Sequence, residues 1–566
     1  MWGPRPSYPA ALTIQDRSAA SRCGDVLKWR PSSLTARIAS PVKVGIDFGT
    51  TRVVVAAVDR GNYPLVNFET PDGHVRDWFP PLLAVQGEVR AYGWEAWRMQ
   101  GQPGWTIFRS LKRLLRNAGP ESRLEIGGQS LEIRLVMREL MEALRDQLRE
   151  RSTLSAKRSD SLEAMLGVPA NANSNQRFLT TEAARDAGFE VLGLLNEPSA
   201  AAVEFAHRDR ASRKTHPEGW LMVYDLGGGT FDASLIELGD DTHSIVASDG
   251  IPTVGGDDFD EILAELALTA AEISPDEREA LSASEWFTLL EECRDKKEAL
   301  NPNTRKVTVD LELVRDGWRE VSVPVSAFYE QCRALIESTR EVVERLLTQN
   351  PEHPIDTLYV TGGGSELPPV ARILREEFGK RVRRSAYMRS ATAIGLAIRA
   401  DAQSGFVLRD QFMRNFGLWR ETDEGRSVQF DLIFPRGTTL PAPKQPPLQS
   451  IRSYQPAHNI GHFRYLECTR LAGDGRPVGE ITDWDDIRFP FEPNLQDRHD
   501  LASLPVVRTS GTKRFVIEET YTCDSSGSLA VLISNKSTGF KKTFRLGRWS
   551  AKQPKMSADR ARAQRA

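Results

Sequence analysis

Residues 221–232 read Leu-Met-Val-Tyr-Asp-Leu-Gly-Gly-Gly-Thr-Phe-Asp, an apolar strand followed by an acid, three glycines, a hydroxyl and a second acid. A near copy, Val-Gly-Ile-Asp-Phe-Gly-Thr-Thr, occupies residues 44–51, about 180 residues earlier. Each copy has the groups that hold a phosphate: glycines that bring backbone N–H groups close to anionic oxygens, a hydroxyl beside them, and an Asp that can face a metal. One such run would be a weak signal. Two predict a pair of phosphate hairpins that close on one nucleotide from opposite sides.

The composition is that of an ordinary globular chain. Its 566 residues exceed the roughly 250–300 residues at which single cores stop growing, so we expect two or more domains. A net charge of −3 gives no electrostatic reason to bind nucleic acid or an anionic membrane. No apolar run approaches the roughly 18 residues of a membrane span. The five cysteines are scattered and never form Cys-x-x-Cys, which favours unpaired thiols and a cytoplasmic location.

Residues 42–403 alternate strand-like runs with amphipathic runs of helix length, which predicts an α/β domain. The expected strands are 42–47, 53–58, 163–168, 221–225, 232–238, 306–313 and 356–361. The expected helices are 131–151, 176–187, 257–273, 284–300, 326–348 and 366–378.

The flanking segments differ in character. Residues 1–41 resemble a transit peptide in composition, but four prolines disfavour an amphipathic helix, so we expect a disordered extension. After a linker at 404–414, residues 415–549 hold short β-rich runs between turn residues, which predicts a separate all-β domain. We expect a disordered polar tail at 550–566. The expected strands of the β-domain are 429–434, 462–468, 513–521 and 529–534, with a hairpin connection at 524–527.

Three further motifs follow the hairpins: Leu-Asn-Glu-Pro-Ser-Ala-Ala-Ala at 195–202, Gly-Gly-Asp-Asp-Phe-Asp at 255–260, and Tyr-Val-Thr-Gly-Gly-Gly-Ser at 359–365. Five motifs in this order resemble the ATPase domain of the heat-shock protein 70 (DnaK-like) chaperones, in the actin-like ATPase superfamily. The likeness covers residues 42–400. It implies a two-lobed α/β ATPase of the ribonuclease-H-like kind, followed by a smaller β-sandwich-like domain.

Phosphoryl transfer needs charge neutralisation and positioning, not a covalent protein nucleophile. Asp47 and Asp225, at the two strand ends, can hold Mg²⁺ through its waters. Glu197 and Asp232 are candidates to orient or deprotonate the attacking water. The resemblance adds Lys112, which matches the family's lysine beside the γ-phosphate. The β- and γ-phosphates are assigned to Gly49, Thr50, Thr51, Gly227, Gly228, Gly229 and Thr230, the last also a catalytic candidate.

The adenosine side departs from the family's pattern. Lys297 matches the lysine that contacts the ribose, but the acidic partner of that sugar aligns with Arg294. Glu298 and Glu366 stand where many members place basic or apolar residues against adenine, and Arg389 replaces an aspartate. We therefore expect weak adenine binding and relaxed base selectivity. The other residues that the resemblance assigns to the nucleotide are Gly256, Gly362 and Gly363.

The resemblance implies an ATP-binding, slowly ATP-hydrolysing chaperone that binds unfolded polypeptide or a specific client, with a co-chaperone or exchange factor as a further partner. Two alternatives stay open: an ATPase switch whose β-domain is a fixed adaptor, and a small-molecule kinase of the same superfamily. We expect no helical lid, because only 17 polar residues follow Trp549, and hence fast peptide release. Arg409 and Asp410 interrupt the apolar linker, which predicts weak coupling between nucleotide and peptide.

Overall fold

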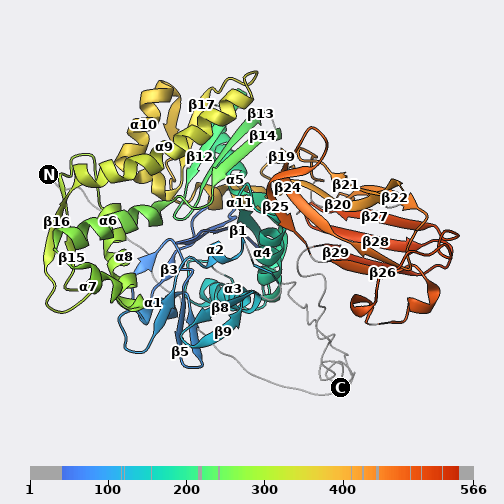
Figure 1. Ribbon diagram of the computed structural model, residues 1–566. Coiled ribbons are helices and arrows are strands. Elements are labelled where there is room, and N and C mark those ends of the chain that lie inside the picture. Colours follow the sequence, from blue (N-terminus) through green and yellow to red (C-terminus); the bar gives the residue numbers. More distant parts are fainter. Residues whose placement is uncertain are drawn as a thin grey trace, which may run out of the picture. The chain divides into compact units, whose positions relative to one another are not determined.

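The computed structural model describes residues 41–546 except 117, 120–121, 155, 214–218, 240–241, 410, 413, 424–425, 442–444, 485, 499 and 526. The expectations for residues 1–40 and 547–566 lie outside the described residues. Figure 1 shows an α/β part in blue to yellow and a β-rich part in orange to red.

The first lobe is built on a four-stranded sheet of β1 (Val42–Phe48), β2 (Val53–Ala57), β10 (Leu162–Val168) and β11 (Glu190–Asn196). The strand order is β11-β10-β1-β2, and β1 runs parallel to β10 and antiparallel to β2. Helix α4 (Ser174–Asp186) packs against β10 and β11, and α3 (Ile133–Glu150) packs on α4. The shorter elements are β3 (Phe68–Glu69), β4 (Val75–Arg76), β5 (Leu83–Gln86), β6 (Val89–Tyr92), α1 (Trp94–Arg98), β7 (Thr106–Phe108), α2 (Leu111–Leu114), β8 (Arg123–Ile126) and β9 (Gln129–Glu132).

The second lobe is built on a six-stranded sheet of β12 (Gly219–Leu226), β13 (Phe231–Leu238), β14 (Thr242–Ile251), β17 (Thr357–Thr361), β18 (Val382–Arg384) and β19 (Val407–Arg409). The strand order is β18-β17-β12-β13-β14-β19. The surrounding elements are α6 (Gly256–Ala270), α7 (Pro275–Glu279), α8 (Ala283–Glu298), β15 (Lys306–Asp310), β16 (Glu320–Pro324), α9 (Val325–Gln349), η1 (Gly363–Glu366), α10 (Pro368–Phe378) and η2 (Gly379–Arg381).

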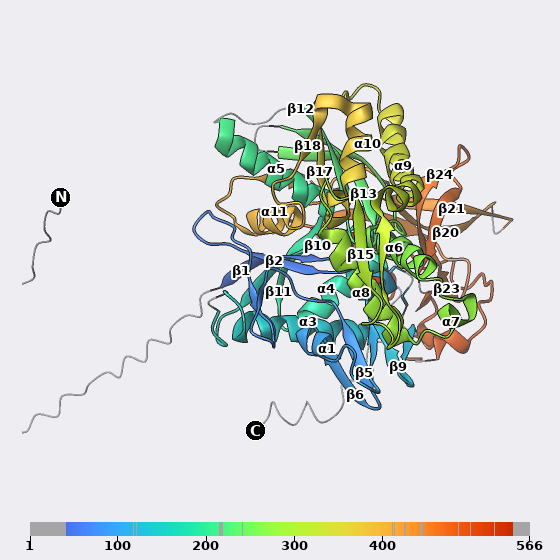
Figure 2. The ribbon, with the colours of Figure 1, turned by 90° about the vertical axis from the view of Figure 1, so that its left-hand side faces the viewer.

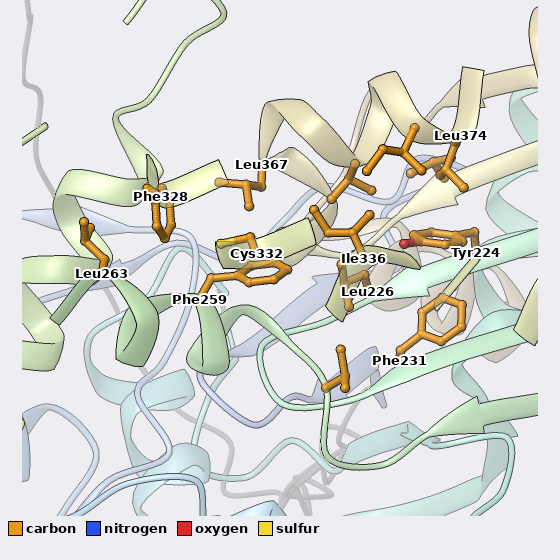
Figure 3. Packing of buried hydrophobic residues seen from close by; sticks show 14 of the residues in the cluster. Tyr224, Leu226, Phe231, Phe259, Leu263, Phe328, Cys332, Ile336, Leu367 and Leu374 are labelled. Atoms are coloured by element: carbon orange, nitrogen blue, oxygen red, sulfur yellow. The ribbon is translucent and has the colours of Figure 1, made fainter. Parts of the chain in front are cut away.

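Apolar side chains from the sheet and the helices form the core of the second lobe. Aromatic and aliphatic residues of β12, β13, α6, α9 and α10 meet between the sheet and the helices, as Figure 3 shows. The residues labelled there are Tyr224, Leu226, Phe231, Phe259, Leu263, Phe328, Cys332, Ile336, Leu367 and Leu374. This packing fixes β12, and with it the loop that follows the strand.

Two helices, α5 (Glu197–Arg213) and α11 (Ala391–Ala400), connect the lobes. They pack on each other, with α11 against β1, β2 and β10 and α5 against β12 and β13; Figure 2 shows them side by side. Their crossing is very close: a Cβ on Gly395 would lie 1.8 Å from the carbonyl oxygen of Ala200. Glycine and alanine at this contact therefore let the helices, and the lobes that they carry, approach each other.

The C-terminal region holds two four-stranded antiparallel sheets, β21-β20-β24-β25 and β22-β27-β28-β29, and the pair β23-β26. Its strands are β20 (Asn415–Thr422), β21 (Ser427–Phe434), β22 (Leu448–Tyr454), β23 (Ile460–Phe463), β24 (Tyr465–Leu471), β25 (Pro477–Asp483), β26 (Ile487–Pro490), β27 (Ile517–Cys523), β28 (Leu529–Asn535) and β29 (Lys541–Leu546). Alternate side chains of β27 and β28 are buried, and they join side chains of β20 and β24 in one apolar cluster.

A charged group bridges the two sheets inside this region. Glu519 of β27 is fully buried, and its carboxylate lies 2.5 Å from the guanidinium of Arg420 of β20. Arg420 also pairs with Asp431 at 2.6 Å, and Asp431 pairs with Arg452 of β22 at 3.0 Å. Because a buried carboxylate is stable only when it is paired, this contact ties the sheets together.

Most expected elements are present with shifted ends. The helix expected from residue 366 begins at Pro368, because residues 363–366 form a 3-10 turn. The strand expected at 462–468 is two strands, which separate at Arg464. The hairpin connection at 524–527 is confirmed, because β27 and β28 pair antiparallel on either side of it.

The sequence expectations for the cysteines and for membrane-spanning segments can be compared with the described residues. The four cysteines within them, Cys293, Cys332, Cys468 and Cys523, are free and buried, as the sequence predicted. Among the described helices, none combines the length and apolar character needed to cross a bilayer.

Candidate functional site

The two glycine-rich loops meet face to face. One joins β1 to β2 and the other joins β12 to β13, where the Gly227 N–H closes the turn by donating to the Thr230 carbonyl at 2.9 Å. A Cβ on Gly228 would lie 2.5 Å from the Thr51 hydroxyl, and one on Gly229 would lie 2.7 Å from the Thr50 methyl. Side chains at these positions would therefore push the loops apart.

A cavity of about 110 Å³ lies between the loops. It collects residues from all five motifs named in the sequence analysis. Of the predicted residues, those that line it are Asp47, Gly49, Thr50, Thr51, Lys112, Glu197, Asp225, Gly227, Gly228, Thr230, Gly256, Lys297, Gly362 and Gly363. Asp232 lines an adjoining cavity instead, and Gly229 packs against Thr50. The volume is below the roughly 300–1,000 Å³ of typical ligand pockets, so a ligand of ordinary size would fit only if the lobes separated.

Buried carboxylates surround this cavity. Burial raises the pKa of Asp47 to about 7 and that of Asp232 to about 7, and it holds the pKa of Asp225 well above its usual range. Repulsion by Glu197 acts in the same direction on all three groups. A cation between the strand ends would offset this repulsion. The described residues hold no group of three or more His, Cys, Asp or Glu side chains placed to bind a metal ion directly, so a metal here would bind largely through water.

Lys112 is the cation that faces these acids. Its ammonium donates to Glu197 at 2.5 Å, and both side chains are buried. Burial lowers the pKa of Lys112, but Glu197 and then Asp47 raise it by more, so the lysine remains charged. Glu197 is placed here because it begins α5 directly after β11. The sequence predicted both residues for the site, and the structure pairs them.

The segment before Lys112 is fastened to the second lobe. Ser110 has φ 62°, and its hydroxyl donates to Asp257 at 3.0 Å. Arg109 lies 3.3 Å from Asp257 and 3.4 Å from Glu291. A non-glycine residue with positive φ is held by such contacts. Arg109 was missed by the sequence analysis; the only signal was a basic residue next to Lys112 and an acidic run at 257–260.

On the adenosine side, charged pairs connect the lobes. Arg52, just after the first loop, lies 2.6 Å from Glu298 of α8. Arg389 lies 2.7 Å from the same carboxylate and also pairs with Glu366. The sequence interpretation treated Glu298, Glu366 and Arg389 as separate departures from the family's pattern; the structure pairs the guanidinium of Arg389 with both carboxylates. Lys297 donates to Asp260 at 2.5 Å.

The linker is paired to the second lobe. Residues 407–409 form β19, which runs parallel to β14 at the sheet edge. Arg409 does not prevent this pairing, because strand pairing uses backbone groups. The strength of the coupling between nucleotide and peptide stays a prediction. Asp410 lies outside the described residues.

The C-terminal region touches the first lobe through a buried carboxylate. Glu467 of β24 accepts hydrogen bonds from the backbone N–H of Ser174 at 3.0 Å and from its hydroxyl at 2.8 Å. These groups belong to the N-terminus of α4, which favours negative charge. Glu480 of β25 accepts from Arg116 at 2.5 Å and from Arg414 at 2.9 Å. The contact therefore joins the region to the lobe through charged groups.

The family model described as Hsp70 protein matches residues 136–465. This is more than half of the chain, and it spans the second glycine-rich loop, Glu197, the adenosine-side residues, the linker and the first strands of the C-terminal region. The mixed α/β lobes and the β-rich region fit the ATPase and β domains of that family. Asp47 and Lys112 lie before the matched residues.

Proposed function

The chain belongs to the Hsp70 protein family, in the actin-like ATPase superfamily, and on that premise we propose that it is an ATP-hydrolysing chaperone. ATP would bind between the two loops, and the nucleotide state would change the affinity of the C-terminal region for unfolded polypeptide or one client. The observation that carries the proposal is the meeting of the two loops around the buried Lys112–Glu197 pair. The family match favours this reading over a small-molecule kinase.

The proposed reaction is hydrolysis of the terminal phosphoanhydride. A water oxygen forms a bond to the γ-phosphorus, the bond to the β–γ bridging oxygen breaks, and ADP and inorganic phosphate result. We assign Glu197 and Asp232 to orient the water and accept its proton, since the raised pKa of Asp232, about 7, suits a group that gains and loses protons near neutrality. Lys112 and Thr230 would support the charge on the transferring group.

Asp47 and Asp225 are the proposed contacts to Mg²⁺, through water. When bound, Mg²⁺ supplies positive charge to the phosphates. Gly49, Thr50, Thr51 and Gly227–Gly229 would hold the phosphates by backbone and hydroxyl donors. The loop contact at Gly228 supports this role, because only a residue without a side chain fits there.

The base would be held by charged groups that differ from the family's pattern. Arg389 would supply a guanidinium on this side, and its carboxylate partners Glu298 and Glu366 keep it in place. Lys297, Gly256, Gly362 and Gly363 are the proposed adenosine contacts. A Cβ on Gly362, whose φ is 87°, would lie 2.4 Å from an Asp225 oxygen, so glycine is required where the adenosine turn meets the metal side.

Coupling would run through the paired linker and the carboxylate contacts of the C-terminal region. Separation of the lobes moves β14 and α4, and these elements hold β19 and Glu467. A ligand shifts such an equilibrium only by its different affinity for the two states. We propose a cytoplasmic setting, with a co-chaperone or exchange factor as a further partner.

ATP turnover measured with and without an unfolded polypeptide tests this function. We expect slow, Mg²⁺-dependent hydrolysis that the polypeptide stimulates several-fold. A folded protein at the same concentration is the control and should leave the rate unchanged. Equal rates with unfolded and folded protein would reject the chaperone and favour the alternative of an ATPase with a fixed adaptor.

A further inference from the structure

A second cavity, of about 670 Å³, adjoins the one between the loops. Thr50, Lys112 and Thr230 line both cavities, so the two meet at the groups proposed to hold the terminal phosphate. From there the second cavity extends past Asp232 to the C-terminal region, where Arg436 is part of its wall. It is large enough for a small hydrated anion, because one water occupies about 30 Å³ of liquid.

Basic groups outnumber acidic groups in this wall. The positive residues are Lys112, Arg113, Arg116, Arg345, Arg436 and Arg470, and the acidic residues are Asp232, Asp249 and Glu480. The wall therefore favours an anion.

Most of the positive groups already have partners. Lys112 pairs with Glu197, Arg116 lies 2.5 Å from Glu480, and Arg345 lies 2.7 Å from Asp249. Arg113 is 3.7 Å from Asp258. Carboxylates therefore already engage these four cations and help to hold the wall together.

Arg436 and Arg470 are different. Within the part of the chain that the structure describes, neither guanidinium has a carboxylate within 4.0 Å. Arg436 makes only long contacts, to the carbonyls of Thr469 at 3.4 Å and Ser248 at 3.5 Å. Desolvation lowers the pKa of the Arg436 guanidinium, Asp249 raises it, and the like charge of Arg470 lowers it further. The two guanidinium groups are therefore close enough to repel each other, and among the described residues no carboxylate pairs directly with either.

We propose that this cavity binds inorganic phosphate between Arg436 and Arg470 and receives the phosphate that hydrolysis releases between the loops. The inference rests on the proposed ATPase. Guanidinium groups match tetrahedral oxyanions by paired N–H donors, and the shared residues Thr50 and Thr230 make the cavity continuous with the reaction site. Since both arginines belong to the C-terminal region, movement of that region would change the site through which phosphate leaves.

Calorimetry with inorganic phosphate, on the full chain saturated with MgADP, tests the site. The double variant Arg436→Ala/Arg470→Ala should bind phosphate at least about tenfold more weakly than the unmodified chain, because each arginine supplies charge-assisted hydrogen bonds. Arg476→Ala is the matched control, because it removes one positive charge from the neighbouring turn. Arg476 pairs with Asp474 at 2.6 Å, and this variant should bind phosphate as tightly as the unmodified chain. The three side chains are solvent-accessible, so the fold should survive, and unchanged MgADP affinity will verify this.

A second readout links the site to the product. Added phosphate should inhibit ATP turnover, and the double variant should need about tenfold more of it for the same inhibition. No phosphate binding to the unmodified chain, or equal affinity in the double variant, overturns the site. Arginine-dependent binding without any ATP hydrolysis would refute the proposed function and the product role. Hydrolysis with arginine-independent phosphate binding would refute this inference alone.

Discussion

Lys112→Ala is expected to lower the turnover number for ATP hydrolysis by about 100-fold or more, while MgATP still binds. The Lys112 ammonium lies 2.5 Å from Glu197 and among the acids of the cleft, so it can offset charge that develops in the transition state. We expect nucleotide binding to survive the loss of Lys112, because the proposal assigns binding mainly to the glycine-rich loops. Quenched-flow kinetics at saturating MgATP measures the effect.

Lys296→Ala is the matched control for this change. Lys296 lies on α8 next to Lys297, but 41% of its side-chain surface is exposed, and it pairs with Glu292 at 3.3 Å. Its removal should leave turnover within about twofold, since exposed pairs contribute little. Hydrolysis by Lys112→Ala at the unmodified rate would contradict the assigned role.

Arg420→Met should destabilise the C-terminal region by about 3–5 kcal/mol, because it leaves the fully buried Glu519 carboxylate without its cation. The methionine keeps much of the apolar stem, so lost packing explains little of the effect. Hydrogen exchange of peptides from β27 during urea unfolding measures it, since a chain of several parts need not unfold in one step.

The double variant Arg420→Met/Glu519→Leu should recover most of this stability, because it removes the buried charge together with its partner. Arg452→Met is the second control. Arg452 is more exposed than Arg420, and its partner Asp431 remains paired with Arg420 in this variant. The loss in the free energy of unfolding should therefore stay below about 1 kcal/mol. If Arg420→Met and Arg452→Met unfolded alike, the bridge between the sheets would carry no special energy.

Much of the α/β fold could be predicted from periodicity, but the helices between the lobes could not. Helix α3 buries a residue every three or four positions, and the sequence shows this pattern. In α5 and α11 nearly all described side chains are buried, so no polar face marks them as helices. Only their small residues, such as Gly395 and Ala200, indicate the close contact between them.

The candidate site likewise contains features that the sequence predicts and contacts that it does not. The glycine-rich loops can be predicted from the sequence, because few other motifs place an acid, glycines and a hydroxyl at a strand end. The sequence does not predict the pairs Arg389–Glu366 and Glu467–Ser174. Glu467, for example, lies 293 residues from Ser174 in the chain. Such contacts depend on how folded elements meet, and a single sequence carries no local signal for them.

The rate at which a labelled apolar peptide leaves the full chain, measured by fluorescence anisotropy in ADP and in ATP, tests the central claim most directly. The proposal requires the nucleotide between the loops to act on the C-terminal region through β19 and Glu467. It predicts that ATP accelerates peptide release at least about tenfold, which corresponds to a barrier to release that is lower by about 1.4 kcal/mol. Equal release rates in the two nucleotides, or no peptide binding in either, would contradict it.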